Sequence, residues 1–139
     1  MKAFVVDASV ALKWLLVEEH SDTALVLLDG SFDLHVPNLI FSEFGNTLWK
    51  KTVRGELNGD QVREAISLFQ DLPLRVHRDR WLLQRATDLA CLLAHPVYDC
   101  YYLALAEILE TTVVTADRKF VNKVADRTRA VFVTDFLQA

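Results

Sequence analysis

The sequence contains few of the residues that mark disulfide-bonded, low-complexity or membrane-embedded proteins. It has two cysteines, three prolines and four glycines among 139 residues. Cys91 and Cys100 match no metal-binding spacing, and both lie in apolar helical patterns, so we expect buried thiols in a reducing compartment. No apolar run approaches the roughly 18 residues that a membrane helix requires. Without an internal repeat, low-complexity stretch or linker, the sequence predicts a single domain over residues 1–139.

Two other patterns are also absent. The N-terminus superficially resembles a signal peptide, but Asp7 and Lys13 interrupt its apolar stretch and no small-residue cleavage motif follows. We therefore expect a cytoplasmic protein. The histidines form no pair at positions i and i+4, which favours core or surface roles over metal ligation. They are His20, His35, His77 and His95.

The charge balance is slightly acidic, with a net charge of −4 at pH 7. This argues mildly against non-specific binding to nucleic acid, although four acids in one metal site would leave the remaining surface close to neutral. The basic residues form two clusters, each of which is by itself typical of a solvated helix face. One contains Lys50, Lys51 and Arg54, and the other contains Arg118, Lys119, Lys123, Arg127 and Arg129.

Short apolar runs alternate with helical patterns along the whole chain. The runs are rich in β-branched and aromatic residues, as buried parallel strands are. Strands are predicted at residues 3–7, 33–36, 74–77, 112–115 and 130–133, and helices at residues 8–17, 21–29, 38–54, 59–71, 79–94, 98–110 and 117–125. Strands that alternate with helices imply a parallel sheet with helices on both faces. We therefore predict an α/β fold in three layers, with a mostly parallel five-stranded sheet.

Four carboxylates stand in or beside apolar runs, where a charge is unfavourable. Asp7 follows AFVV, Glu43 lies within LIFSEF, Asp99 precedes YYLALA, and Asp117 follows TVVTA. A buried carboxylate must be paired, protonated or bound to metal, because removing a lone charge from water is very costly. A carboxylate in an apolar run at each of four distant positions suggests one shared site. Oxygen ligands without cysteine or histidine suit a hard cation such as Mg²⁺ or Mn²⁺.

The predicted topology brings the four acids toward one place. In such sheets, ligands bind at the carboxyl ends of the strands, where the strand order reverses. Asp7 ends the first strand and Asp117 lies just past the fourth, so the order 3-2-1-4-5 places them together. Helices beside this crevice would supply Glu43 and Asp99. Asn46 shares a helix face with Glu43, and the first helical turn, where Asp99 lies, favours an anion.

Four segments together resemble the PIN domain, and in particular the VapC-like toxins of bacterial and archaeal toxin–antitoxin pairs. They are residues 5–10, 37–48, 98–106 and 114–120, which read VVDASV, PNLIFSEFGNTL, YDCYYLALA and VTADRKF. The match runs in order through almost the whole chain. It implies a PIN-like fold and a Mg²⁺- or Mn²⁺-dependent ribonuclease whose acidic quartet is Asp7, Glu43, Asp99 and Asp117. Cys100 stands where the family usually has a small alanine and leaves the acid in place.

The chemistry of such a site follows from charge. Carboxylates this close repel one another, and a divalent cation relieves the repulsion while binding water. Such cations activate water for attack on a phosphodiester and stabilise the departing oxygen. We expect Asp7, Asp99 and Asp117 to hold the main ion, with Glu43 acting through water or at a second ion.

Four further residues are candidates for supporting roles. By position, Ser9 and Thr115 match the small hydroxyl residues that support the acids in the family, and an ordinary turn or cap hydroxyl is the alternative for each. Asn46 and Arg118 are candidates for contact with phosphate, and solvated side chains are the simpler interpretation.

Other functional classes fit the sequence less well. A receiver domain needs a phospho-accepting aspartate at the end of its third strand, which reads LRVH here. An aspartate-nucleophile phosphatase needs two aspartates two residues apart, whereas this chain has Asp7 and Ser9. A non-catalytic PIN-like module that acts through protein or RNA contacts is the main alternative. Such a module is expected to have lost one or more acids, and all four are present.

Two predicted helices carry more apolar residues than one buried face requires. Residues 8–17 are apolar on nearly every side, and residues 38–54 also carry more apolar residues than the single apolar stripe of a surface helix. We predict an exposed groove lined by Trp14, Leu15, Trp49 and Val53; the alternative is that they fill the chain's own core. The family resemblance implies an antitoxin in that groove and RNA as substrate. A homodimer is expected from the general frequency of two-fold pairs.

Overall fold

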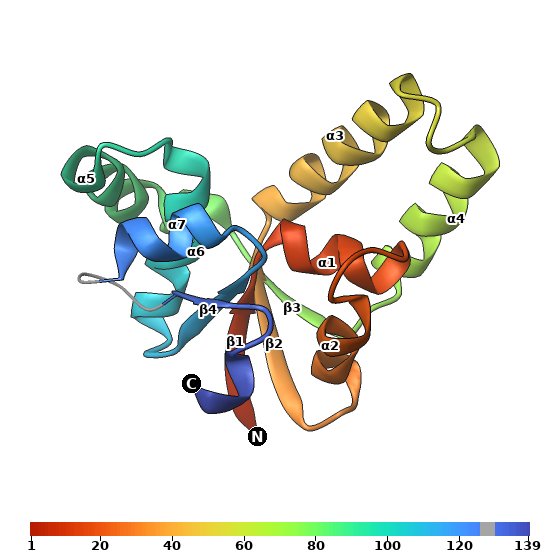
Figure 1. The fold of residues 1–139 in the computed structure, drawn as a ribbon. Helices are drawn as coiled ribbons and strands as arrows, with labels where there is room; N and C mark the ends of the chain where they lie inside the picture. The colour runs from red at the N-terminus through yellow and green to blue at the C-terminus, as the bar shows by residue number, and fades with distance from the viewer. Residues whose placement is uncertain (126–129) are drawn as a thin grey trace.

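A five-stranded parallel sheet organises the fold (Figure 1). The computed structural model of the chain describes residues 1–125 and 130–139. Its strands are β1 (Lys2–Val6), β2 (Phe32–Pro37), β3 (Leu74–His77), β4 (Thr112–Thr115) and β5 (Ala130–Phe132). They pair in parallel in the order β3-β2-β1-β4-β5, which confirms the predicted sheet and its strand order.

Helices cover both faces of this sheet, as Figure 1 shows. They are α1 (Ala8–Leu15), α2 (Ser21–Leu25), α3 (Leu39–Val53), α4 (Gly59–Gln70), α5 (Leu83–Leu93), α6 (Val97–Ile108) and α7 (Arg118–Val124). Helix α6 packs on one face with α5 behind it, while α1 packs on the other face with α2, α3 and α4 around it. Short 3₁₀ turns are η1 (Val26–Leu28), η2 (Asp79–Trp81) and η3 (Phe136–Gln138). The predicted three-layer arrangement is therefore confirmed.

Local hydrogen bonds explain where several helices begin and end. The Asn58 side chain caps α4 by accepting a bond from the Gln61 backbone N–H at 2.9 Å. In turn, the Gln61 side-chain oxygen accepts a bond from the Asn58 backbone N–H. Gly55 follows α3 with φ +78°, a conformation that glycine adopts without steric penalty. Helix α1 stops at Leu15 rather than at residue 17, because the Ser21 hydroxyl donates to the Leu16 carbonyl and turns the chain.

The core lies on both faces of the central strand β1. Phe4, Val5 and Val6 are fully buried, since the sheet is covered on both sides. The Phe136 ring packs edge-on against Phe4 with 5.8 Å between ring centroids, and against Phe32 at 5.9 Å. The turn η3 thereby closes the core near the start of the first strand (Figure 1).

The positions of Trp14 and Leu15 correct the prediction of an exposed apolar groove. Trp14 lies in the core, where its indole N–H donates to the Ala24 carbonyl at 2.8 Å, and Leu15 packs against the core while partly exposed. Trp49 and Val53 are 60 % and 68 % exposed. Burial between the sheet and the neighbouring helices explains why α1 is apolar on nearly every side. Of the four residues predicted to line the groove, Trp49 and Val53 are the exposed ones.

The two cysteines have different environments. Cys100 is a buried thiol, as predicted, and burial raises its pKa to about 11. Cys91 is an exposed thiol, so its predicted burial is wrong. Cys91 lies in α5, whose buried positions Ala86, Leu89 and Leu93 occupy a different face of the helix.

Within the described ranges, none of the helices alone is long and apolar enough to cross a membrane. Helices α5 and α6 reach that length and composition only when they are taken together, across a bend of 117°.

Candidate active site

Asp7 lies at the carboxyl end of β1 and caps the N-terminus of α1. Its Oδ2 atom accepts a hydrogen bond from the Ser9 hydroxyl at 2.5 Å and another from the Thr115 hydroxyl at 3.1 Å. Thr115 ends the neighbouring strand β4, whose Val114 carbonyl accepts a bond from the Asp7 N–H at 3.0 Å. Adjacent parallel strands thus bring two distant segments to one carboxylate.

The same hydroxyl groups connect Asp7 to Asp117. The Thr115 oxygen accepts a bond from the Asp117 backbone N–H at 3.1 Å, and the Ser9 oxygen accepts one from the Ala116 N–H at 3.0 Å. The Asp117 side chain is exposed and caps α7 through the Phe120 N–H at 3.1 Å. Both hydroxyls therefore contact the acidic site directly, in addition to any role in local turns.

Glu43 and Asp99 come from helices on opposite faces of the sheet. The Glu43 carboxylate, on α3, accepts a 2.6 Å bond from the phenol of Tyr102 on α6. Asp99 lies in the first turn of α6, and its Oδ2 atom is 2.6 Å from His95 Nε2. Because an ionised carboxylate only accepts, this imidazole nitrogen is the donor. The His95 ring also packs against Phe120, with 5.0 Å between ring centroids.

The acids affect one another's proton affinity. Burial raises the pKa of Asp7, and the charge of Asp99 raises it further, while bonds from Ser9 and Thr115 act in the opposite direction. Burial also raises the pKa of Glu43 to about 7, and the charges of Asp7 and Asp99 contribute to this shift. The charge of Asp99 therefore acts on both Asp7 and Glu43, and the charge of Asp7 acts on Glu43.

These residues fit a divalent cation by their chemistry. All the candidate ligands are carboxylate oxygens, a donor set typical of Mg²⁺ and Mn²⁺, and their mutual repulsion is what a cation relieves. Among the described residues, however, no three Asp, Glu, His or Cys side chains lie together closely enough to hold an ion. The acids stand instead as separate carboxylates, each bonded to a neighbouring donor.

The remaining predicted site residues occupy different places. Asn46 lies beside Glu43 in a hollow of about 270 Å³, which is also lined by Leu39, Ser42 and Tyr98. The Arg118 guanidinium instead stacks over the Phe132 ring at 3.9 Å.

Some residues of the two basic clusters form ion pairs or hydrogen bonds within the protein. Lys51 forms ion pairs with Glu18 at 3.4 Å and Glu56 at 3.6 Å, and Lys123 donates to the Ala94 carbonyl at 2.9 Å. Both contacts support the interpretation of these lysines as ordinary helix-face residues. Arg127 and Arg129 lie outside the described residues.

Sequence reasoning missed three residues that contact the acids or this end of the sheet. His95 lies in the loop just before α6, whose cap residue is Pro96, and contacts Asp99 four residues later in the chain. Because His95 is outside the helix, no helical spacing predicts this contact. Tyr102 contacts Glu43 across 59 residues, and Asp79 accepts the Leu39 N–H at 3.1 Å across 40 residues. These two contacts depend on the fold, and no local pattern predicts them.

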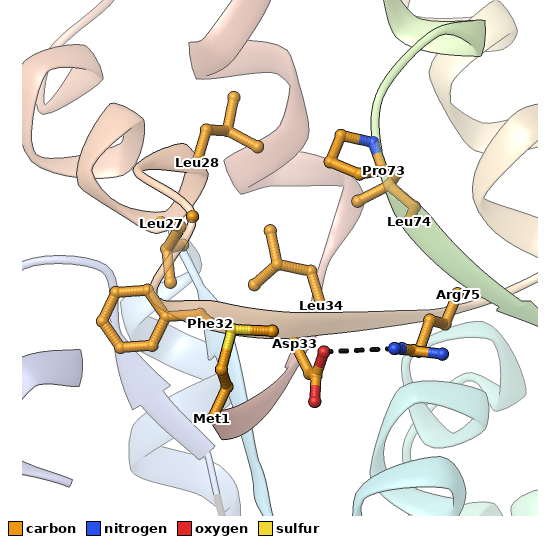
Figure 2. A pocket seen from close by; sticks show the side chains of 10 residues that line it. Met1, Leu27, Leu28, Phe32, Asp33, Leu34, Pro73, Leu74 and Arg75 are labelled. Atoms are coloured by element: carbon orange, nitrogen blue, oxygen red, sulfur yellow. Dashed lines mark hydrogen bonds and ion pairs between the residues drawn. The ribbon is translucent and has the colours of Figure 1, made fainter.

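A second hollow, of about 370 Å³, lies at the amino ends of the strands (Figure 2). Residues at the start of β2 and β3, including Phe32 and Leu74, line it together with Met1. An ion pair between Asp33 and Arg75, at 3.4 Å, spans its edge in Figure 2. Asp7 and Asp117 follow the opposite, carboxyl ends of β1 and β4, so this hollow lies away from them.

Known proteins are similar to this chain in sequence and in fold. Ribonuclease VapC3 of Pyrobaculum aerophilum is 35 % identical over 124 residues, which cover 86 % of this chain and 92 % of that protein. The crystal structure of PAE2754 from Pyrobaculum aerophilum matches with a TM-score of 0.70 and 23 % identity, over 99 % of this chain and 93 % of that one. VapBC2 of Rickettsia felis, in a structure bound to a DNA fragment from their promoter, matches with a TM-score of 0.68 and 12 % identity, over 94 % and 98 % of the two chains.

The two structural similarities concern the fold. The family is shown by the sequence, since residues 4–126 match the PIN domain and the similarity to VapC3 spans most of both chains. This chain belongs to the PIN domain family.

Proposed function

We propose that this chain is a divalent-metal-dependent endoribonuclease and the toxin of a toxin–antitoxin pair. The main support is the desolvated Asp7 carboxylate, which hydroxyl groups tie to Asp117 and which lies in the field of Asp99. The relative VapC3 is named a ribonuclease, and its similarity extends over 92 % of its length. A desolvated carboxylate that hydroxyl groups orient but do not neutralise opposes folding when it is ionised, and a function that requires the charge explains its presence.

The chain's own residues would hold the acids in position for this reaction. Asp7, Asp99 and Asp117 are the proposed ligands of Mg²⁺ or Mn²⁺, and Glu43 is the fourth acid of the site. When bound, the cation would supply an activated water and positive charge next to the scissile phosphate. Ser9 and Thr115 fix one oxygen of Asp7.

Two further contacts orient the other acids. Tyr102 holds Glu43, and His95 holds Asp99, each at 2.6 Å. Contacts of this kind reduce the number of orientations of a carboxylate, which favours metal binding.

The proposal also covers partners and location. An antitoxin protein is the proposed partner, and the exposed Trp49 and Val53 on α3 are candidate contacts for it or for a second copy in a homodimer. Residues 1–139 would act as one PIN-like domain in the cytoplasm, where the free thiols Cys91 and Cys100 remain reduced.

The proposal is tested by cleavage of end-labelled single-stranded RNA with purified protein. Activity should require Mg²⁺ or Mn²⁺, stop in excess EDTA, and be suppressed by Ca²⁺, which prefers more ligands at longer distances. Asp7→Asn and Asp99→Asn should each lower the rate about a thousandfold or more, since a catalytic metal contributes several kcal/mol. Asp88→Asn, the same change at an exposed position of α5, should leave the rate unchanged.

Two outcomes would contradict the proposal. Full cleavage in EDTA would exclude a metal-dependent mechanism. Binding of RNA without cleavage under every metal condition would favour a non-catalytic PIN-like module.

A further inference from the structure

The hollow beside Glu43 has one wall from α3 and another from α6. Leu39, Ser42, Glu43 and Asn46 are spaced at i, i+3, i+4 and i+7, so they form one continuous face of α3. Tyr98, in the first turn of α6, lines the other side. The hollow therefore lies between the two helices that carry Glu43 and Asp99.

The lining combines an aromatic surface with neutral polar groups. Tyr98 is 59 % exposed, so its ring is accessible from solvent. Ser42 and Asn46 are exposed and carry both donors and acceptors, while Leu39 is a partly buried apolar residue. Aromatic rings stack on nucleobases, and serine and asparagine side chains form hydrogen bonds with base edges.

The position of the hollow connects it to the proposed cleavage site. Glu43 is both a wall residue and one of the four acids, and Tyr98 directly precedes Asp99. Tyr98 also lies four residues before Tyr102, whose phenol holds Glu43, so both tyrosines point along one side of α6. A group in the hollow would therefore lie next to a phosphate held at the acids.

We infer that this hollow is a subsite for one unpaired nucleobase of an RNA strand, adjacent to the scissile phosphate, with Tyr98 as the stacking surface. The inference rests on the proposed function. The volume of about 270 Å³ is below that of typical pockets for drug-sized ligands and suits a single planar group. A base held in this way must be turned out of any helix, so the substrate class is single-stranded or looped RNA.

The test combines removal of the ring with removal of the base. Cleavage sites are first mapped on a pool of single-stranded RNA of random sequence in Mg²⁺. One cleaved oligonucleotide is then resynthesised with an abasic nucleotide at each position that flanks the cut. For the wild type, one of these changes should lower kcat/KM about 5- to 150-fold, which is the range expected for one base–aromatic stack.

Tyr98→Ala should lower kcat/KM for the intact RNA by a similar factor and should then be insensitive to the same abasic change. Tyr98→Phe keeps the ring and should behave as the wild type does. Trp81→Ala removes another exposed aromatic residue from outside the hollow and should keep both the rate and the sensitivity. Binding of Mn²⁺ to Tyr98→Ala, measured by calorimetry, should equal that of the wild type, which separates the subsite from the acids.

Two results would overturn the inference while leaving the proposed function intact. In one, Tyr98→Ala cleaves as fast as the wild type. In the other, the effects of Tyr98→Ala and of the abasic nucleotide multiply, as they do for independent sites. Failure of the wild type to cleave any RNA would instead refute the proposed function and the inference with it.

Discussion

At the residue scale, three of the four acids of the site accept hydrogen bonds from side chains. Ser9 and Thr115 hold Asp7, Tyr102 holds Glu43, and His95 holds Asp99. The hydroxyl groups orient Asp7 and Glu43 but do not neutralise them. The site therefore stores electrostatic repulsion that the protein tolerates for its function.

Neutralising Asp7 should stabilise the protein in the absence of metal. Burial and the charge of Asp99 both disfavour the ionised form of Asp7, and asparagine keeps an oxygen that can accept from Ser9 and Thr115. We expect Asp7→Asn to raise the unfolding free energy on the order of 1 kcal/mol in EDTA, as measured by urea denaturation. Asp88→Asn should change it by less than about 0.5 kcal/mol. A less stable Asp7→Asn protein would contradict this account of the repulsion.

His95 should act as a positioning residue for Asp99. Its bond to Asp99 measures 2.6 Å and its ring packs on Phe120, so the imidazole is fixed from two sides. We expect His95→Ala to weaken Mn²⁺ binding about 10- to 100-fold in calorimetry, the usual effect of removing a partner of a metal ligand. His95→Gln, which keeps an N–H donor, should recover most of the affinity. Equal affinities for the wild type and His95→Ala would show that the contact has only a structural role.

At the element scale, the strands and their order could be predicted from sequence because buried parallel strands are short, apolar and separated by helices. Helix ends were less predictable. The segment 79–94 divides into η2 and α5, and α1 stops early because Ser21 bonds to the Leu16 carbonyl. The four acids could be identified from their apolar surroundings. Their partners Tyr102 and Asp79 could not, because those contacts depend on how α3, η2 and α6 meet in space.

Strands β2 and β3 carry a pair of histidines that should make stability depend on pH. His35 Nδ1 and His77 Nε2 are 2.9 Å apart, and one of the two nitrogens must be unprotonated for this bond to form. Burial lowers the pKa of both imidazoles below 6.5, and for His35 the charge of His77 lowers it further. Folding thus favours the neutral form of both imidazoles.

This stabilisation is present above about pH 6.5 and is lost as the pH falls toward the folded-state pKa values, because the unfolded chain then binds more protons. Protonation of Glu43 and Asp7, whose pKa values are raised, acts in the opposite direction over this range. The histidine contribution is therefore read from a comparison of the wild type with His77→Gln, which removes one of the titrating imidazoles. Between about pH 7 and about pH 5, the unfolding free energy of the wild type should change less favourably than that of His77→Gln in urea denaturation. An equal change in the two proteins, or a less favourable change in the variant, would contradict the assignment.

At the scale of the whole molecule, the acids and the hollow share Glu43, while the exposed end of α3 lies further along the same helix, and each has its own proposed role. The acids lie at the carboxyl ends of β1 and β4 and on the adjoining helices α3 and α6. Trp49 and Val53 extend the exposed apolar surface along α3, beyond the hollow. A partner bound at Trp49 and Val53, as proposed, would therefore lie on the same helix as Glu43 and next to the proposed substrate site.

The central claim, that these acids cleave RNA, is tested most directly by mapping RNA ends in cells after induced expression. The wild type and Asp7→Asn are expressed to equal levels, and the 5′ ends of total RNA are sequenced. The account predicts a set of new ends with the wild type that is absent with Asp7→Asn. The same new ends with both proteins, or no new ends with either, would contradict it.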